Sequence, residues 1–303
     1  MDIGIMVEGQ NGLNWKRWKN IVAAVEDLGF FGLFRSDHFT NLSSPDKDSL
    51  DLWISLTWLA DNTSRIEFGP LVTPFSFRHP VITARMASAV DDLSGGRLIL
   101  GLGAGWQERE HNMYGFDLME PHARFDRMEE GLRLTKLLFE QDHLFDFKGN
   151  YYQANGAVML PRPQRPGGPQ ILIGGIGKKR TLPMSAKYAN EWNAMFLTPQ
   201  SFLELNIEMD RNLQKVNRAP ETLVRSMMTG LRFGRTRDEL DSKLASSKQS
   251  VMDLRKRGIL VGVGDEIKPQ LQEIEKVGLQ RIMLQWLDLD DLGGLAALAK
   301  VVL

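Results

Sequence analysis

The sequence predicts an α/β protein whose strands close into a (β/α)8 TIM barrel. Apolar segments of strand length alternate with longer amphipathic segments, and eight such strand-then-helix units follow one another along the chain. A series of this kind favours a parallel sheet, because a parallel connection needs a crossover helix. The length of 303 residues fits eight units with additional segments, since such barrels typically have about 250 residues. An open, doubly wound parallel sheet is the alternative fold.

The first four units are predicted between residues 3 and 102. Residues 3–7 alternate as in a strand, and residues 15–28 carry apolar side chains at helical spacing up to Gly29, a residue that often ends a helix. Pro80 begins a later helix, which Gly95-Gly96 ends. The other elements expected in this half are strands at 30–35, 66–73 and 98–102 and helices at 49–62 and 80–93.

The second half begins with a long helix at 124–140 and an irregular hairpin at 145–160 that turns at Lys148-Gly149-Asn150. Four prolines between 161 and 169 run directly into the fifth strand, so we expect a packed connection there rather than a domain linker. We treat residues 1–303 as one domain. The remaining strands are predicted at 171–173, 192–196, 223–233 and 282–286, and the remaining helices at 179–189, 199–216, 238–257, 266–277 and 292–302.

The composition excludes several classes of protein. Lys and Arg number 37 against 38 Asp and Glu, so the net charge of −1 gives no broad electrostatic reason to bind nucleic acid or an anionic membrane. The absence of cysteine excludes disulfides, thiolate catalysis, iron–sulfur clusters and Cys-based zinc sites. No apolar run approaches the ~18 residues that span a bilayer, and residues 1–8 are typical of a strand rather than a signal peptide.

The catalytic groups of a (β/α)8 barrel lie at the carboxyl ends of its strands. The segment Arg35-Ser36-Asp37-His38-Phe39 follows the second strand. An imidazole beside a carboxylate suits proton transfer near neutral pH, because the carboxylate can set the tautomer and basicity of the ring. A helix-capping Asp37 with a structural His38 is the alternative interpretation.

Two further segments follow the third and fourth strands. In Gly69-Pro70-Leu71-Val72-Thr73-Pro74, a bulge or unusual peptide would point backbone groups at a ligand, and a simple loop exit is the alternative. Gly101-Leu102-Gly103-Ala104-Gly105-Trp106 resembles a dinucleotide-binding loop, but Trp106 occupies the place of the third glycine in G-x-G-x-x-G. We expect instead a strand end of small residues that lets a flat ring approach the backbone.

The segment Gly174-Gly175-Ile176-Gly177-Lys178-Lys179-Arg180-Thr181 lies between the fifth strand and a helix. Backbone N–H groups at a helix start, flexible glycines and nearby cations suit phosphate binding, although Lys179 in the Ser/Thr place excludes a P-loop. A glycine turn before a solvated basic helix is the alternative. The five histidines show neither His-x-His nor His-Glu-x-x-His, so we expect no metal site, and a Ser-His-Asp hydrolase lacks its G-x-S-x-G elbow. These patterns favour a phosphate-bearing ring cofactor in the barrel mouth.

Over nearly the whole chain, these segments resemble the luciferase-like monooxygenase superfamily, and within it the branch that uses the deazaflavin coenzyme F420. One departure is Asn190-Glu191, where the family usually has Asp-Gly. The resemblance is carried by Ser36-Asp37-His38-Phe39, Leu71-Val72-Thr73-Pro74, Arg78-His79-Pro80, Asp92-Leu93-Ser94-Gly95-Gly96-Arg97, Gly101-Leu102-Gly103-Ala104-Gly105-Trp106, Pro161-Arg162-Pro163, Ile173-Gly174-Gly175 and Tyr188-Ala189-Asn190-Glu191-Trp192-Asn193.

The resemblance implies a (β/α)8 barrel with an insertion between strands four and five, at about 106–170. It also implies a non-prolyl cis peptide at Pro70-Leu71 behind the cofactor ring, a cytoplasmic location and a dimer. The residues expected to bind the cofactor are Asp37, His38, Pro70, Leu71, Thr73, Gly105, Trp106, Arg109, Gly174, Gly175, Ile176 and Gly177.

We therefore expect an oxidoreductase that transfers a hydride between coenzyme F420 and a small organic substrate. His38 would donate or accept the matching proton, and Asp37 would orient it; Glu8, Trp106 and Arg109 are candidates for the substrate side. One alternative is a monooxygenase that uses reduced FMN, supplied by a separate reductase, and oxygen. The other is a non-catalytic flavin-binding protein on the same barrel. Nothing in the sequence identifies the substrate.

Overall fold

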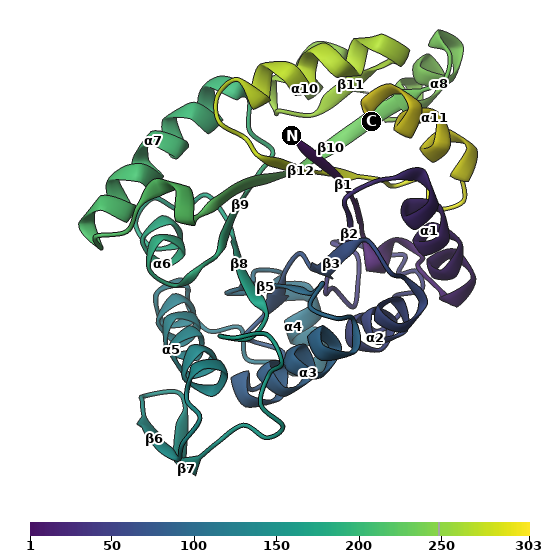
Figure 1. Ribbon diagram of the computed structural model, residues 1–303. Helices are drawn as coiled ribbons and strands as arrows, with labels where there is room; N and C mark the ends of the chain where they lie inside the picture. The colour runs from purple at the N-terminus through teal and green to yellow at the C-terminus, as the bar shows by residue number, and fades with distance from the viewer. Residues whose placement is uncertain (248) are drawn as a thin grey trace.

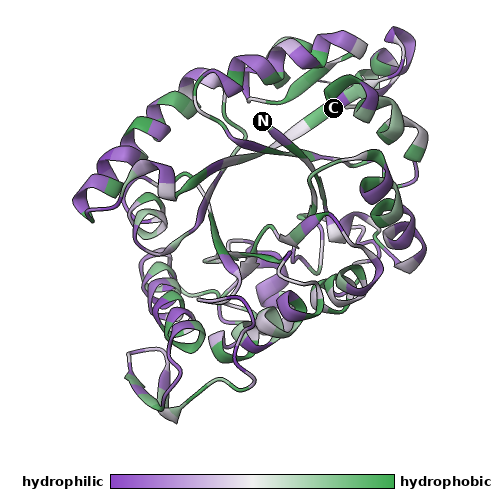
Figure 2. Cartoon of the chain, viewed as in Figure 1, coloured by the Kyte–Doolittle hydropathy of each residue, from purple (hydrophilic) through white to green (hydrophobic). Residues whose placement is uncertain are grey.

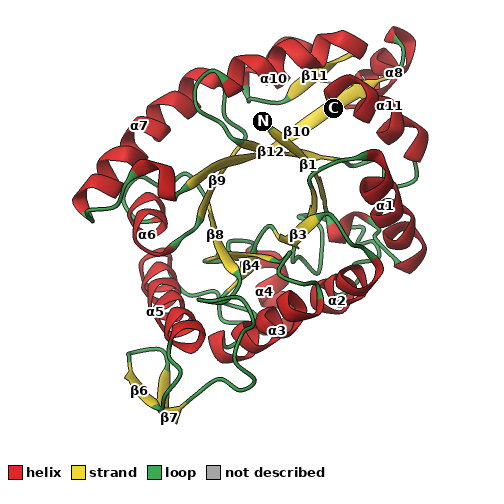
Figure 3. Ribbon diagram, in the orientation of Figure 1, coloured by secondary structure: helices red, strands yellow, loops and turns green. Residues whose placement is uncertain are grey.

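A ring of parallel strands surrounded by helices forms the structure (Figures 1 and 3). The computed structural model describes residues 1–247 and 249–303. An isolated parallel bridge between Phe68 and Leu98 closes the ring. Around the ring, the strands are β3 (Glu67–Pro70), β2 (Gly32–Arg35), β1 (Asp2–Val7), β12 (Arg281–Gln285), β10 (Val224–Gly234), β9 (Glu191–Met195), β8 (Gln170–Gly174), β5 (Ile99–Gly103) and β4 (Thr73–Pro74).

The helices cover the outside of the ring (Figure 3). In α10, Ile267, Leu271 and Ile274 recur at helical spacing and are buried, whereas its outward side is hydrophilic (Figure 2). The helices are α1 (Trp15–Leu28), α2 (Leu52–Asn62), α3 (Pro80–Leu93), α4 (Glu108–Tyr114), α5 (Pro121–Glu140), α6 (Thr181–Tyr188), α7 (Pro199–Lys215), α8 (Arg237–Ser247), α9 (Val251–Lys256), α10 (Ile267–Glu275) and α11 (Leu292–Val302). The (β/α)8 barrel is thereby confirmed.

The expected insertion lies between β5 and β8 and contains α4, α5 and an antiparallel hairpin. The hairpin consists of β6 (Phe145–Lys148) and β7 (Gln153–Ala157), and it projects beside α5 away from the ring (Figure 1). Glu130 of α5 holds the hairpin turn, since its carboxylate accepts hydrogen bonds from the backbone N–H groups of residues 150, 151 and 152 at 2.9, 2.8 and 2.6 Å.

Two expectations for the second half of the chain are corrected. The helix expected at 238–257 consists of α8 and α9, because Ser250 caps a new helix by accepting a hydrogen bond from the Asp253 N–H; residue 248 lies outside the described residues. A further strand, β11 (Leu260–Val263), pairs with the carboxyl half of β10. The amino half of β10 pairs with β12 and β9, so this strand of 11 residues serves both the ring and β11.

The interior of the barrel is filled in layers, because alternate side chains of each strand point inward. An apolar core occupies the middle of the barrel and closes it to passage. Open space is therefore found at the carboxyl ends of the strands. The buried members of this interior core are Met6, Phe34, Leu71, Ile99, Leu172, Met228 and Met283.

A buried ion cluster lies at the amino ends of the strands. Glu191 of β9 is fully buried, and its Oε2 lies 3.1 Å from Nη1 of Arg281, which is also 2.9 Å from Oε2 of Glu67. Burial raises the pKa of Glu191 to about 7, although the Arg281 charge acts to lower it. The departure noted at Asn190-Glu191 therefore puts a carboxylate in the barrel, and Arg281 compensates its charge.

We predict that Arg281→Ala lowers the free energy of unfolding by about 3 kcal/mol near pH 8, because it leaves a buried carboxylate uncompensated. The raised pKa of Glu191 means that the stability this group contributes is complete below about pH 4.5 and is lost as the pH rises through about 7. Near pH 5.5 Glu191 takes up a proton and carries no charge that needs Arg281. The decrease in the free energy of unfolding caused by Arg281→Ala is therefore smaller at that pH than near pH 8. Urea unfolding at the two pH values measures the difference.

The control for this prediction is the double variant Arg281→Ala with Glu191→Gln, which removes the buried charge as well as its partner. It is expected to lose much less stability near pH 8 than the single variant. Equal losses for both variants at both pH values would contradict the assignment of the effect to the Glu191 carboxylate.

Candidate active site

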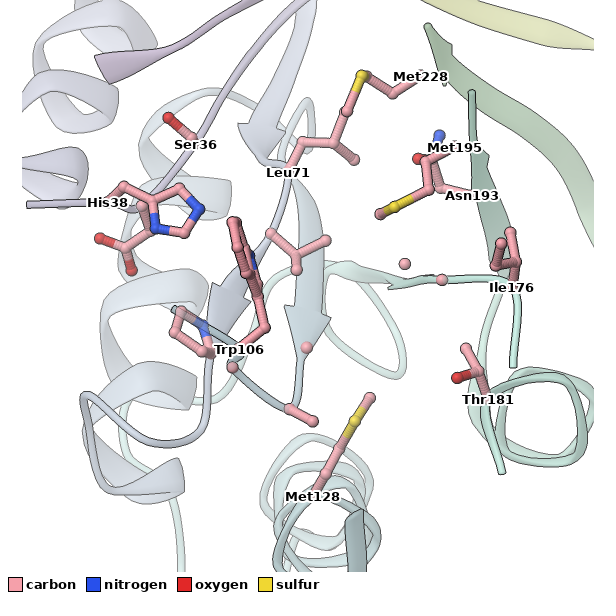
Figure 4. Close-up of a pocket in the computed structure, with 18 of the residues that line it drawn as sticks. Ser36, His38, Leu71, Trp106, Met128, Ile176, Thr181, Asn193, Met195 and Met228 are labelled. Carbon is pink, nitrogen blue, oxygen red and sulfur yellow. The ribbon is translucent and has the colours of Figure 1, made fainter. Parts of the chain in front are cut away.

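A cavity of about 430 Å³ opens at the carboxyl ends of the strands (Figure 4). It has a polar end, an apolar wall and a segment of glycines. The polar end comprises Glu8, Ser36, Asp37, His38, Glu110 and His111. The apolar wall comprises Met6, Leu71, Val72, Pro74, Ala104, Trp106, Phe125, Met128, Ile176, Met195, Phe196 and Met228, and the rest of the lining is Gly103, Gly105, Gly174, Gly175, Gly177, Thr181 and Asn193.

A buried hydrogen-bonded pair forms the polar end of the cavity. His38 Nδ1 lies 2.7 Å from Oε1 of Glu110, whose side chain is 1% exposed, and the Glu110 Oε2 accepts a hydrogen bond from the Phe39 N–H at 2.9 Å. Since Nδ1 is engaged by the carboxylate, Nε2 is the ring nitrogen left to face the cavity, beside Trp106 (Figure 4). The indole of Trp106 meets the His38 ring edge to face, with centroids 5.5 Å apart.

Helix α4 positions Glu110 because polar residues are spaced along one of its faces. Gln107, Glu110 and His111 stand at i, i+3 and i+4, and all three are buried. Gln107 Nε2 donates to the backbone oxygen of Thr40 at 2.9 Å, which ties the same loop to the start of α4. The loop that carries His38 is thus held by α4 at more than one point.

The electrostatics of the pair favour a charged imidazole. Burial by itself lowers the pKa of His38, but the hydrogen bond to Glu110 and its charge, with smaller contributions from Glu8 and Asp37, raise the pKa above its ordinary value. The ring is therefore suited to accept a proton near neutral pH and to return it.

Asp37 does not orient His38, which corrects the expectation from the sequence. Its carboxylate accepts hydrogen bonds from Thr73 Oγ1 at 2.6 Å and from Arg78 Nη1 at 2.5 Å. Neighbouring residues in an extended segment point in opposite directions, so Asp37 and His38 find different partners. Asp37 lies at the cavity with its charge compensated by Arg78, while Thr73 lies behind it and is absent from the lining.

The floor of the cavity is the break between β3 and β4. A non-prolyl cis peptide bond joins Leu71 to Val72, one residue later than the position expected at Pro70-Leu71. The Val72 side chain occupies the space over the glycines at the ends of β5 and β8: a Cβ on Gly103 would lie 2.5 Å from Val72 Cγ2, and one on Gly174 would lie 3.0 Å from Cγ1. The absence of side chains at Gly103 and Gly174 therefore leaves space for the Val72 side chain, which forms part of the floor. Pro70, which was expected to bind the cofactor, lies outside the lining.

The glycine segment lies opposite His38, at the start of α6 (Figure 4). Gly175 adopts a φ of 131°. Its N–H donates to the backbone oxygen of Asn193 at 2.9 Å, and its own backbone oxygen accepts a hydrogen bond from Trp192 Nε1 at 2.8 Å. Lys178 and Lys179 are exposed beside it. Arg180 is held by Asp126 at 2.5 Å, so it belongs to the packing between α5 and α6.

Arg109 does not line the cavity, which corrects its placement on the cofactor or substrate side. Its guanidinium donates hydrogen bonds to Asp46 Oδ1 at 2.7 Å and Oδ2 at 2.6 Å, and to the backbone oxygen of Asn41 at 2.8 Å. It therefore fastens the His38 loop to α4 from the side facing solvent. The predicted residues that do line the cavity are Glu8, Asp37, His38, Leu71, Gly105, Trp106, Gly174, Gly175, Ile176 and Gly177.

Several residues of the cavity were not predicted, and Glu110 is the most consequential. A signal for it exists in the i, i+3, i+4 spacing of Gln107, Glu110 and His111, which separates the buried Glu110 from the exposed Glu108. The sequence gives no such signal for the methionines of the wall, because they come from three strands and a helix that are distant in sequence.

The remaining histidines have other roles. Both ring nitrogens of His111 are hydrogen-bonded, Nδ1 to the backbone oxygen of Gln107 and Nε2 to Ser76 Oγ. His79 caps α3, because its Nδ1 accepts a hydrogen bond from the Val81 N–H. In the described part of the chain, no three His, Asp or Glu side chains gather in a way that would hold a metal ion. None of the helices in the described ranges has the length and apolar character that a membrane crossing requires.

The fold and this cavity agree with a known protein family. A family model described as luciferase-like monooxygenase matches residues 1–299. The chain therefore belongs to the luciferase-like monooxygenase family.

Curated relatives include proteins that are named for their use of F420. An F420-dependent glucose-6-phosphate dehydrogenase from Kineococcus radiotolerans is 31% identical over 153 residues, 50% of this chain and 45% of the relative. A phthiodiolone/phenolphthiodiolone dimycocerosates ketoreductase from Mycobacterium bovis is 31% identical over 186 residues, 60% of this chain and 47% of the relative. The match thus spans about half the length of each of these relatives.

Solved structures of low sequence identity share the fold. An F420-dependent secondary alcohol dehydrogenase in complex with an F420-acetone adduct superposes with a TM-score of 0.87 at 16% identity, over 99% of this chain and 98% of the other. A coenzyme F420-dependent tetrahydromethanopterin reductase from Methanopyrus kandleri superposes with a TM-score of 0.81 at 17% identity, over 100% of this chain and 99% of the other. The monooxygenase RslO1 from Streptomyces bottropensis superposes with a TM-score of 0.82 at 17% identity, over 99% of this chain and 98% of the other.

We predict that Glu110→Gln lowers the pKa of His38, because the burial that opposes the charged ring is then no longer outweighed by a carboxylate. A pH titration of the His38 ring signals by NMR measures the shift. Asp37→Asn is the matched control, since it removes a carboxylate that is already paired with Arg78 and is expected to shift the pKa less. A larger shift in the control than in Glu110→Gln would overturn the assignment of Glu110 as the partner of His38.

Proposed function

We propose that this protein is an F420-dependent oxidoreductase that transfers a hydride between the deazaflavin and a small organic alcohol or carbonyl compound. The observation that carries this proposal is the buried His38–Glu110 pair beside an apolar cavity that ends in a glycine segment. The F420-dependent relatives, at 31–33% identity over half of the chain, support the choice of cofactor.

The residues of the cavity suit this cofactor. Leu71 and Val72 offer an apolar floor on which a flat ring system can rest. The Gly175 N–H is engaged by the Asn193 backbone oxygen, but Ile176, Gly177 and the start of α6 offer backbone N–H groups for the phosphate-bearing tail, with Lys178 and Lys179 nearby to balance its charge. His38 and Trp106 would then stand beside the ring, on the side where a substrate enters.

The chemistry divides between the cofactor and His38. When bound, F420 supplies a ring carbon that accepts or gives a hydride. When an alcohol is oxidised, its O–H proton passes to His38 Nε2 while the carbon loses its hydrogen as hydride, and the product is a carbonyl compound. In the reverse direction, the imidazolium returns that proton to the carbonyl oxygen.

Glu110 is a positioning residue in this scheme. By accepting a hydrogen bond from Nδ1–H, Glu110 fixes the tautomer in which Nε2 carries a lone pair. Its negative charge also stabilises the imidazolium that forms when Nε2 takes up a proton. Trp106, Phe125 and the methionines keep water away from the reacting atoms. The protein thus positions the two reactants and manages one proton, which is the usual contribution of an enzyme to cofactor chemistry.

We predict that His38→Ala lowers kcat by about 100-fold or more, because general acid–base catalysis contributes on the order of 10²–10⁴ in rate. The affinity for F420 is expected to change little, since floor and glycine segment are intact. Turnover is followed by the absorbance of F420, and affinity by fluorescence titration. His122→Ala, at an exposed histidine, is the control. Undiminished turnover of His38→Ala would remove His38 from the mechanism.

A second prediction concerns the cofactor itself. Titration of the purified protein is expected to give saturable binding of F420 and much weaker binding of FMN. Tight FMN binding without F420 binding would replace this proposal by a monooxygenase that uses reduced flavin. Tight F420 binding with no turnover across a broad panel of alcohols and carbonyl compounds would favour a cofactor-binding protein without catalysis.

A further inference from the structure

The ionisable groups that line the cavity are carboxylates and imidazoles. They are Glu8, Asp37, Glu110, His38 and His111, and the described residues of the lining include no lysine or arginine. A site for a phosphate or carboxylate group normally presents Arg, Lys or free backbone N–H groups. The wall of this cavity away from the glycine segment offers none of these cations.

Glu8 is the carboxylate of the lining that is held by amides rather than by a salt bridge. The buried Arg35 lies close enough to interact with its charge, but its guanidinium donates hydrogen bonds to Leu50, Asp51 and Ser55 and is outside the lining. Glu110 is paired with His38, and Asp37 with Arg78. Glu8, by contrast, receives hydrogen bonds from two amides, Gln10 Nε2 at 3.0 Å and Gln285 Nε2 at 2.7 Å, and forms no ion pair within the described ranges. It stands close enough to His38 to raise the pKa of that ring. The polar end of the cavity therefore has a negative charge next to the proton carrier.

The wall opposite this charge is apolar and adaptable. Met6, Met128, Met195 and Met228 contribute thioethers from four different elements, and Figure 4 shows the labelled methionines directed into the cavity. Methionine side chains are flexible and make no strong hydrogen bonds, so they accept varied apolar shapes. A substrate surrounded by them gains from hydrophobic contact rather than from polar recognition.

We propose that the substrate is an uncharged, largely apolar alcohol or its carbonyl counterpart, and that Glu8 makes the site reject anions. This inference rests on the proposed function, which places the cofactor tail at Gly174–Gly177 and so commits the backbone N–H groups there. A second anionic group near His38 meets the Glu8 carboxylate, and the described residues of the lining include no lysine or arginine that could bind it. The site thus differs from one built for a phosphorylated sugar, the substrate named in two of the curated relatives.

The exposed indole of Trp106 fits this proposal. Its residue is 57% exposed, yet it contacts His38 and lines the cavity, so it forms the apolar edge of the opening. A neutral substrate that enters there passes over an aromatic face and places its oxygen at His38 Nε2. Glu8 also offers an acceptor for a second hydroxyl group, which an anionic group cannot use.

The test compares two ketones of equal length, 2-pentanone and 4-oxopentanoate, which differ in a methyl group against a carboxylate. Binding of each to the protein saturated with F420 is measured by calorimetry at low salt, where charge effects are least screened, and kcat/KM is measured with reduced F420. We expect 2-pentanone to bind at least tenfold more tightly. Equal binding, or tighter binding of the anion, would overturn the proposal.

Glu8→Gln and Glu108→Gln separate the role of Glu8 from a general effect of charge. Glu108 lies on the same side of the barrel but is exposed and outside the lining. Glu8→Gln is expected to reduce the preference for 2-pentanone over 4-oxopentanoate at least threefold, because the anion then binds more tightly. Glu108→Gln is expected to leave this preference unchanged. An unchanged preference in Glu8→Gln would remove Glu8 as its cause.

Two further outcomes distinguish this inference from the function on which it rests. If F420 binds but neither ketone does, the substrate class is wrong and the cofactor assignment stands. If F420 fails to bind, the proposed function falls, and the substrate inference falls with it.

Discussion

A buried carboxylate, that of Glu110, sets the arrangement of the whole polar end of the cavity. A carboxylate that is removed from water must be compensated by charge or by hydrogen bonds, or it destabilises the fold. Here the compensation comes from the His38 ring and the Phe39 N–H, both on a loop 71–72 residues earlier in the chain. The need to satisfy Glu110 therefore orients His38, and the same contact keeps the ring basic.

The rest of the barrel supports this contact by leaving space at the correct end. The ion cluster around Glu191 fills the amino end, and the apolar core fills the middle, so the cavity is confined to the carboxyl ends of the strands. Val72 closes the floor against strand-end glycines. A ring-shaped ligand is thus offered one apolar surface, one proton carrier and one glycine segment, and each comes from a different part of the strand ring.

Much of the site was predictable because strand ends converge in this fold. The segments after strands two, three, four and five were expected to meet, and they do. The errors have a common physical cause. Asp37 is adjacent to His38 in sequence, but successive residues of an extended chain point apart, so adjacency did not mean contact. Arg109 and Glu110 are also adjacent, and the phase of α4 turns one toward the solvent side of the loop and the other into the core.

The sequence by itself determined the fold class, the position of most strands and helices, and the family, because periodicity and short motifs are local properties of the chain. Tertiary structure alone decided which carboxylate supports His38 and where the non-prolyl cis peptide bond lies. It also decided how methionines from distant elements form a wall, and that Glu8 forms no salt bridge in the described part of the chain. These features depend on contacts between segments that lie far apart in sequence, where packing geometry, rather than residue type, selects the partner.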